Sequence, residues 1–182
     1  MRQAVGVDHQ ARRHVILLGL MGAGKTTVGT DLAARLDVPL RDSDADMLAA
    51  TGETARQLRD SLGEDALHAR EAQHLLDSMA RPDGAVICAA AAVADDARCV
   101  EALRRTHDLV VWLQVPPGVL AARFAREPHR PAYGVDTVAF LTAQAGRREP
   151  IYRALADLVV PTGGGAAGAG AEVETILDAL RS

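Results

Sequence analysis

The feature that most constrains this chain is a glycine-rich segment between a short apolar run and a helical pattern. The segment reads Gly19-Leu20-Met21-Gly22-Ala23-Gly24-Lys25-Thr26 and fits the pattern G-x-x-x-x-G-K-[ST]. Residues 14–18 before it are typical of a buried strand, and apolar residues recur at helical spacing over residues 24–36. In this order, the turn and the helix N-terminus can surround an anion with backbone N–H groups. The sequence therefore favours a phosphate-binding loop over an ordinary glycine-rich turn.

The same segment carries side chains suited to a nucleoside triphosphate. The candidates for nucleotide binding are the loop and the first helical turn: Gly22, Ala23, Gly24, Lys25, Thr26 and Thr27. The Lys25 ammonium can reach the β- and γ-phosphates, and the Thr26 hydroxyl can bind Mg²⁺. Loops of this kind serve many protein classes, so the acceptor of the phosphoryl group must be found elsewhere. A chain of 182 residues leaves little room for the extra modules of a motor, which favours a small-molecule kinase.

Strand and helix patterns alternate along the chain. Strands are expected at residues 14–18, 38–40, 85–88, 109–113 and 158–160, and helices at 24–36, 45–80, 96–105, 117–124, 135–153 and 172–180. The helical pattern over 45–80 is interrupted near Gly52 and Gly63, and Gly163–Gly170 is expected to be a flexible connection. Such alternation predicts one α/β domain over residues 1–182, with three layers and a central five-stranded parallel sheet, the P-loop kinase architecture.

Composition excludes several classes of partner. A net charge of −4 and an aromatic content of 3% argue against nucleic-acid binding. No apolar run approaches the length of a membrane span, and residues 1–13 lack the apolar stretch of a signal peptide. Two cysteines, Cys88 and Cys99, cannot form a metal site alone and suggest a reducing compartment. We therefore expect a cytoplasmic protein.

Several short motifs, in order, resemble the shikimate kinase family over nearly the whole chain. They are Lys25-Thr26-Thr27-Val28-Gly29, Leu32-Ala33-Ala34-Arg35-Leu36, Asp42-Ser43-Asp44, Thr51-Gly52-Glu53, Gly63-Glu64, Arg70-Glu71, Arg130-Pro131 and Arg148-Glu149-Pro150-Ile151-Tyr152. The phosphate loop alone is common to many families, but its combination with the Asp-Ser-Asp and Arg-x-Pro-x-Tyr elements is specific. The resemblance implies ATP and Mg²⁺ as cofactors, an acceptor site in a helical region at about 45–75, and a lid at about 126–134.

The resemblance also assigns residues to the reaction. By it, Asp42 helps to hold Mg²⁺, and Asp44 contacts the acceptor hydroxyl and takes its proton, a role that suits a carboxylate. The alternative for Asp-Ser-Asp is a helix cap. Arg130 closes over the γ-phosphate with the lid, and Arg123 lies on the nucleotide side; each could instead be a solvated arginine. Arg148 meets an anionic group of the acceptor, with Arg147 as the alternative partner.

Departures from the family pattern cluster in the expected acceptor site. Where the family has three consecutive glycines, this chain has Ala89, Ala90 and Ala91, followed by Ala92. Each alanine costs about 1–2 kcal/mol wherever the backbone is left-handed, so the loop is expected to be reshaped. His68 stands where the family has a carboxylate-binding arginine, and Arg59 and Leu67 stand where it has phenylalanines. Histidine lacks the planar fork of arginine and is largely neutral at pH 7. Arg59 either adds positive charge to the pocket or points to solvent.

Two hypotheses of function follow. The first is ATP-dependent phosphoryl transfer to a hydroxyl of a small molecule, with shikimate or a related cyclic polyol or hydroxy acid as the acceptor. The second is a nucleotide-binding protein that has lost transfer and acts through partners. Asp44 and Arg130 favour the enzyme, because a pure binder requires neither a base nor a lid charge.

Overall fold

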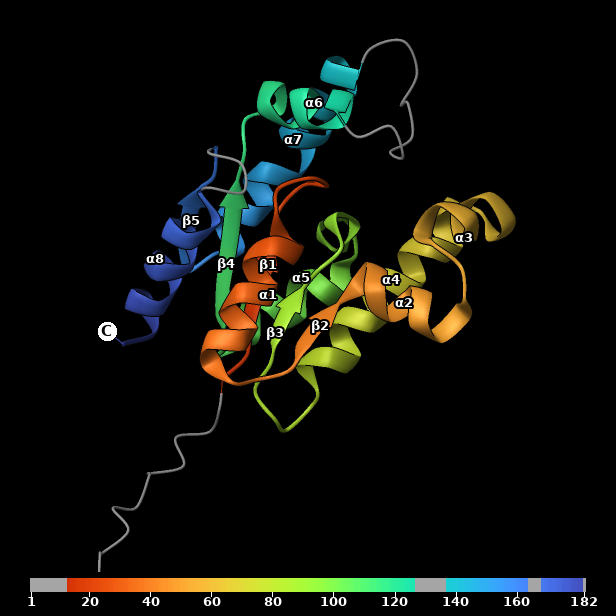
Figure 1. The fold of residues 1–182 in the computed structure, drawn as a ribbon. Helices are drawn as coiled ribbons and strands as arrows, with labels where there is room; N and C mark the ends of the chain where they lie inside the picture. Colours follow the sequence, from red (N-terminus) through yellow and green to blue (C-terminus); the bar gives the residue numbers. More distant parts are fainter. Residues whose placement is uncertain (1–12, 127–136, 164–167, 182) are drawn as a thin grey trace, which may run out of the picture.

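A five-stranded parallel sheet organises the computed structural model, which describes residues 13–126, 137–163 and 168–181 (Figure 1). The strand order is β2-β3-β1-β4-β5, and every neighbouring pair is parallel. The strands are β1 (Val15–Leu18), β2 (Leu40–Asp42), β3 (Val86–Cys88), β4 (Leu109–Gln114) and β5 (Leu158–Pro161). This architecture confirms the α/β fold with a central five-stranded parallel sheet.

The central strand delivers the phosphate loop to one edge of the sheet. All four residues of β1 are buried, as expected for a parallel strand covered on both faces. The register pairs Leu17 with Cys88, and Cys88 with Asp42, so the carboxyl ends of three neighbouring strands meet at this edge. Strand β2 covers 40–42 rather than the expected 38–40, because Pro39 has no N–H to donate. Asp42 therefore ends a strand instead of following one.

Helices cover both faces of the sheet (Figure 1). Helices α1 (Lys25–Leu36) and α8 (Ala169–Arg181) pack against each other on one face. The opposite layer contains α4 (Glu64–Met79), α5 (Ala97–Arg105) and α7 (Thr137–Leu155), while α6 (Pro117–Arg126) packs on α7. Within the described residues, no helix combines the length and the apolar character that a bilayer crossing requires. Both cysteines are buried and free.

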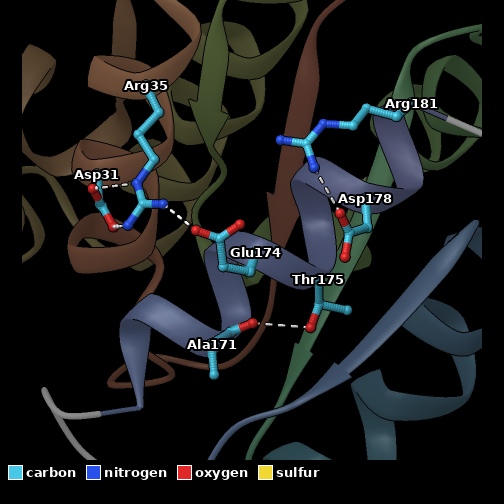
Figure 2. A network of polar contacts seen from close by, with 7 residues as sticks. All are labelled: Asp31, Arg35, Ala171, Glu174, Thr175, Asp178 and Arg181. Carbon is cyan, nitrogen blue, oxygen red and sulfur yellow. Dashed lines mark hydrogen bonds and ion pairs between the residues drawn. The ribbon is translucent and has the colours of Figure 1, made fainter.

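Polar contacts on the outer surface join α1 to α8 (Figure 2). Arg35 donates to Asp31 one turn earlier in α1 and also pairs with Glu174 of α8. All three side chains are well exposed, so the pairs add little to stability. Helix α8 begins at Ala169, earlier than the expected 172, because Ala171 and Glu172 donate N–H bonds to the Gly168 carbonyl and close the first turn. The glycine-rich connection is therefore shorter than expected, and its residues 164–167 lie outside the described part of the chain.

A small helical unit follows β2. It consists of α2 (Ser43–Thr51), α3 (Ala55–Leu62) and the first turns of α4, and α3 lies at the far side of the molecule from the sheet (Figure 1). The chain turns at Gly52 and Gly63, which have φ values of 75° and 90°, where the sequence predicted interruptions. A separate apolar cluster of Met47, Leu58 and Leu67 holds the unit together.

Gly29 fixes how closely α1 approaches the sheet. A Cβ atom at this position would lie 2.5 Å from Cys88 Sγ and 3.2 Å from Leu40 Cδ1. We predict that Gly29→Ala lowers the free energy of unfolding, because overpacking costs about 1–3 kcal/mol and exceeds the gain in helix propensity of about 1 kcal/mol. Urea unfolding measures the change.

Two further variants sharpen this test. Gly146→Ala in α7 is the matched control, because its Cβ would meet nothing within 4 Å, and it should leave stability unchanged or raise it. Cys88→Ala removes the clashing sulfur. The double variant with Gly29→Ala and Cys88→Ala should therefore lose less free energy of unfolding than the sum of the losses in the two single variants. Strict additivity would show that the sulfur is not the obstacle.

Candidate functional site

The phosphate loop connects β1 to α1 with a backbone that depends on glycine. Gly22 and Gly24 have φ values of 80° and 97°, and a Cβ on Gly19 would lie 2.8 Å from the Leu113 carbonyl oxygen. The Lys25 ammonium lies inside the loop and donates to the carbonyl oxygens of Gly19 (2.8 Å) and Leu20 (3.0 Å). Burial lowers the pKa of Lys25, against the attraction of nearby acidic groups. The loop thus surrounds a buried cation.

A cavity of about 570 Å³ opens beside this loop, and we call it the loop cavity. Its lining comprises residues 21–28 together with Asp42, Ser43, Asp44, Cys88, Ala90, Arg123, Thr162, Ala169 and Glu172. All six residues predicted to bind nucleotide in the loop and first helical turn are in this lining. The volume is that of a small-molecule site.

Asp42 combines two interactions. Its Oδ2 accepts a hydrogen bond of 2.8 Å from the Thr26 hydroxyl. Its Oδ1 accepts from the backbone N–H groups of Asp44 (3.1 Å) and Ala45 (3.2 Å), which caps α2. The helix-cap alternative is therefore real, and it coexists with the contact to the phosphate loop. The two predicted metal-binding residues, Thr26 and Asp42, lie side by side.

A second cavity of about 220 Å³ lies between the small helical unit and α7, and we call it the helix cavity. Residues from α3, α4 and α7 line it, together with Ala91 and Ala92. Asp44 and Met21 belong to the linings of both cavities. Asp44 thus lies at the junction, where a group held in one cavity can react with a group held in the other.

Arg148 is the most buried cation of the helix cavity. Its Nε and Nη2 both donate to Asp95 Oδ2, at 3.0 and 2.6 Å, and Nη1 has no hydrogen bond to any residue that the structure describes. Arg147, the alternative weighed from the sequence, is exposed and donates to the same oxygen at 2.9 Å. Asp95 could not be singled out from the sequence, because the contact joins positions about fifty residues apart.

The substituted positions also line the helix cavity. His68 Nε2 lies 3.7 Å from Glu64 Oε1, and Leu67 is buried beside it. Arg59 belongs to the lining, and its Nη2 donates to Asp60 at 3.3 Å, so it is a cation at the cavity wall whose charge is partly offset by a neighbouring carboxylate. Arg56, which the sequence analysis passed over, lies in the same lining.

The alanine run adopts a backbone that avoids the left-handed strain considered from the sequence. Residues Ala91–Asp95 form a 3₁₀ turn that the sequence analysis did not anticipate, and Ala90 has a φ of −61°. Among the described residues, Asp37 is the one non-glycine position with a positive φ. Ala90 lines the loop cavity, Ala91 and Ala92 line the helix cavity, and Ala89 is buried in the main core, outside both linings.

Two charged residues mark the far side of the loop cavity. Arg123 Nη1 donates to the Gly22 carbonyl at 2.8 Å and lines the loop cavity, so its predicted role beside the nucleotide is compatible with its position. Glu172, which the sequence analysis missed, is 8% exposed, and burial raises its pKa while Arg123 opposes the rise. Arg130 and the predicted lid at 126–134, apart from its first residue, lie outside the described residues.

Glu71 contributes a buried carboxyl to the helix cavity. Burial and the charge of Asp44 raise its pKa from 4.5 to about 7, against the opposing influence of Arg148 and Lys25. The sequence showed this residue only as part of the Arg70-Glu71 motif and gave it no role. Its protonation changes the charge of the cavity near neutral pH.

We predict a pH-dependent stability difference for Glu71→Gln. Because the folded-state pKa is raised, the wild-type protein is stabilised below pH 4.5 and loses up to about 3 kcal/mol as the pH rises through 7. The glutamine variant lacks this loss, so it should match the wild type near pH 4.5 and exceed its stability at pH 8. Urea unfolding at several pH values measures the difference. Glu64→Gln, at an exposed position, is the control, and a difference that does not vary with pH would contradict the assignment.

A buried lysine lies inside the glycine-rich loop, and the Asp44 carboxylate connects the cavity beside this loop to a second cavity. This arrangement defines a phosphotransferase that acts on small molecules. Comparison with known proteins identifies the family: the shikimate kinase model matches residues 21–181. Over 157 residues the chain is 38% identical to the shikimate kinase of Dechloromonas aromatica, covering 85% of this chain and 82% of that protein. The shikimate kinase of Halorhodospira halophila is 37% identical over 155 residues, covering 84% and 86%.

Solved structures agree with this result. The structure described as shikimate kinase from Acinetobacter baumannii in complex with shikimate superposes with a TM-score of 0.84 and 29% identity, covering 94% of both chains. The chain belongs to the shikimate kinase family, and it is a small-molecule kinase that uses ATP as the phosphoryl donor. The comparisons give no support to the non-catalytic alternative.

Lys25 provides a direct test of the loop. It is the only lysine in the sequence. We predict that Lys25→Ala lowers ATP affinity at least about 10-fold, because charge-assisted hydrogen bonds to phosphate are lost. Calorimetry measures the affinity, and circular dichroism checks that the variant is folded. Arg35→Ala removes an exposed cation from the same helix and should leave ATP affinity unchanged; equal affinities in all three proteins would refute the loop assignment.

Proposed function

We propose that this chain transfers the γ-phosphoryl group of Mg·ATP to a ring hydroxyl of shikimate. The observation that carries the proposal is the position of Asp44 in the linings of both cavities. A carboxylate at that junction can contact an acceptor hydroxyl beside a phosphate held by the loop. Support for shikimate comes from the curated relatives and from the Acinetobacter baumannii structure, whose description includes shikimate.

On the nucleotide side, the backbone of residues 22–27 and the Lys25 side chain bind the phosphates. Arg123 on α6 contacts the nucleotide. Thr26 and Asp42 hold Mg²⁺. Their oxygens fit this ion, because Mg²⁺ prefers hard oxygen ligands and is usually shared between one or two side chains, waters and substrate phosphates. Among the described residues, no group of three or more His, Cys, Asp or Glu side chains could hold a metal. When bound, the ion neutralises charge on the phosphates.

In the transfer step, the acceptor hydroxyl gives its proton to the Asp44 carboxylate while its oxygen forms a bond to the γ-phosphorus. The bond between that phosphorus and its bridging oxygen breaks, and the electron pair leaves with ADP. Lys25 stabilises the charge that develops on the phosphoryl oxygens. Arg130 is proposed to add positive charge there when the lid at about 126–134 closes.

The acceptor's acid group is proposed to bind Arg148. Asp95 fixes the guanidinium by accepting from two of its nitrogens, and Nη1 remains available for a carboxylate. His68 provides weaker charge than an arginine would, and Arg59 at the cavity wall adds a cation that the family pattern lacks. Ala91 and Ala92 provide methyl groups beside the acceptor, so the shape of the cavity also contributes to the choice of substrate.

Steady-state release of ADP tests the acceptor. With shikimate present, the protein should release ADP well above its background hydrolysis. The comparison panel contains other cyclic polyols and hydroxy acids, because the changes at His68 and at the alanine run alter the acceptor side of the site. Release with another acid of the panel, and none with shikimate, would overturn shikimate as the acceptor.

Asp44→Asn tests the catalytic carboxylate. We predict that kcat with shikimate falls about 100-fold or more, since general-base catalysis contributes factors of this size, while ATP affinity changes little. Asp46→Asn is the matched control: Asp46 pairs with Arg41 and His74 and lines neither cavity. Equal kcat values for the Asp44 variant and the wild type would remove Asp44 from the mechanism.

A further inference from the structure

Gln144 occupies an unexpected position in the acceptor site. It lies on α7 between Leu141 and Arg148, at spacings of three and four residues that place all three on one face of the helix. All three belong to the lining of the helix cavity. Leu141 and Arg148 are buried, and Gln144 is half-buried between them. The helix therefore presents a side-chain amide to the cavity next to the proposed anchor for the acid group.

The amide oxygen of Gln144 is buried without a hydrogen-bond partner among the described residues. Buried polar atoms nearly always have partners, so an orphaned acceptor beside a cavity indicates a group that arrives with a ligand. The terminal torsion of glutamine has broad, shallow minima, and the rest of the side chain already lines the cavity. Rotation of the amide about this torsion can therefore turn the oxygen toward the cavity.

The chemistry of this group differs from that of the other polar residues in the lining. Those residues are ionisable: Asp44, Arg56, Arg59, Glu64, His68, Glu71 and Arg148. Among them, the arginines favour an acid group, and Asp44 is proposed to contact the reacting hydroxyl. A neutral amide oxygen accepts a hydrogen bond, so the partner that fits it is a neutral donor such as an alcohol.

We infer that Gln144 is a specificity-determining residue, which accepts a hydrogen bond from an acceptor hydroxyl other than the one that is phosphorylated. The inference rests on the proposed function and deepens it. Asp44 contacts the reacting hydroxyl, Arg148 binds the acid group, and Gln144 recognises a further hydroxyl on the ring. Three contacts of different chemistry fix the orientation of a polyhydroxy acid in the cavity.

This role predicts discrimination against deoxy acceptors. A site that hydrogen-bonds a substrate hydroxyl rejects the analogue without it, because the site's own polar group then stays unpaired. If Gln144 only filled space, an apolar side chain of similar size would serve equally well. Because the oxygen is unpaired, replacing Gln144 with an apolar residue should not lower the stability of the ligand-free protein.

The experiment compares shikimate with its two deoxy analogues that keep the reacting hydroxyl. In the wild type, removing from shikimate the one hydroxyl that Gln144 recognises should lower kcat/KM at least about 10-fold. In Gln144→Leu, shikimate itself should show a raised KM, and the penalty for removing that same hydroxyl should shrink to less than twofold. The penalty for the other hydroxyl, and the KM for ATP, should stay as in the wild type.

Two further variants and a stability measurement complete the design. Gln144→Met keeps the length and flexibility of the side chain and should behave like the leucine variant, which covers the case that leucine does not fit. Gln73→Leu makes the same change at an exposed position on α4, outside both cavities, and should behave as the wild type. The thermal midpoint of Gln144→Leu should equal or exceed that of the wild type.

The outcomes separate the inference from the proposed function. The inference is overturned if removal of either hydroxyl from shikimate lowers kcat/KM by the same factor in the two Gln144 variants as in the wild type. It is also overturned if Gln144→Leu has a lower thermal midpoint than the wild type but the same kinetics. A wild-type protein that phosphorylates another hydroxy acid, but not shikimate, overturns the proposed acceptor, and the same comparison is then made with deoxy forms of that acid. A wild-type protein that phosphorylates no acceptor overturns both.

Discussion

The hydrogen bond from Thr26 to Asp42 joins the two halves of the site. Thr26 lies in the first turn of α1, and Asp42 ends β2 and caps α2, so one carboxylate connects the phosphate loop, the sheet edge and the small helical unit. The parallel register brings these segments together, because it pairs Asp42 with Cys88 and Cys88 with Leu17. With Asp42 fixed in this way, Asp44 two residues later is placed at the junction of the two cavities. The position of the proposed base therefore follows from strand pairing.

Charge in the helix cavity is balanced within the protein. Arg148 shares Asp95 with Arg147, His68 lies near Glu64, and the carboxyl of Glu71 is buried among charges of both signs. Because Asp95 neutralises part of the Arg148 charge, that arginine is better described as an oriented donor than as a free cation. An acid group that enters the cavity then gains from directed hydrogen bonds more than from net charge.

The sequence predicted the parts of the structure that depend on local chemistry. The loop, the five strands and the turns at Gly52 and Gly63 follow from glycine positions and apolar runs, which act over a few residues. Asp95, Glu172 and Gln144 could not be found in this way, since each gains its meaning from residues brought close by the fold. The 3₁₀ turn at Ala91–Asp95 was missed because an alanine run does not reveal which turn it will form. The roles proposed for the site residues remain predictions.

The two cavities differ in how much substitution they can accept. In the loop cavity, function is built into the backbone: Gly22 and Gly24 hold positive φ, and a side chain on Gly19 would collide with the Leu113 carbonyl. A change there alters the path of the chain. In the helix cavity, the contacts come from side chains on α3, α4 and α7, whose backbones stay helical when His68 or Arg59 replaces another residue. Even the alanine run is accommodated without positive φ. This difference explains why the helix cavity can accept the departures at Arg59, Leu67 and His68, where a new side chain changes the surface of the cavity without changing the fold.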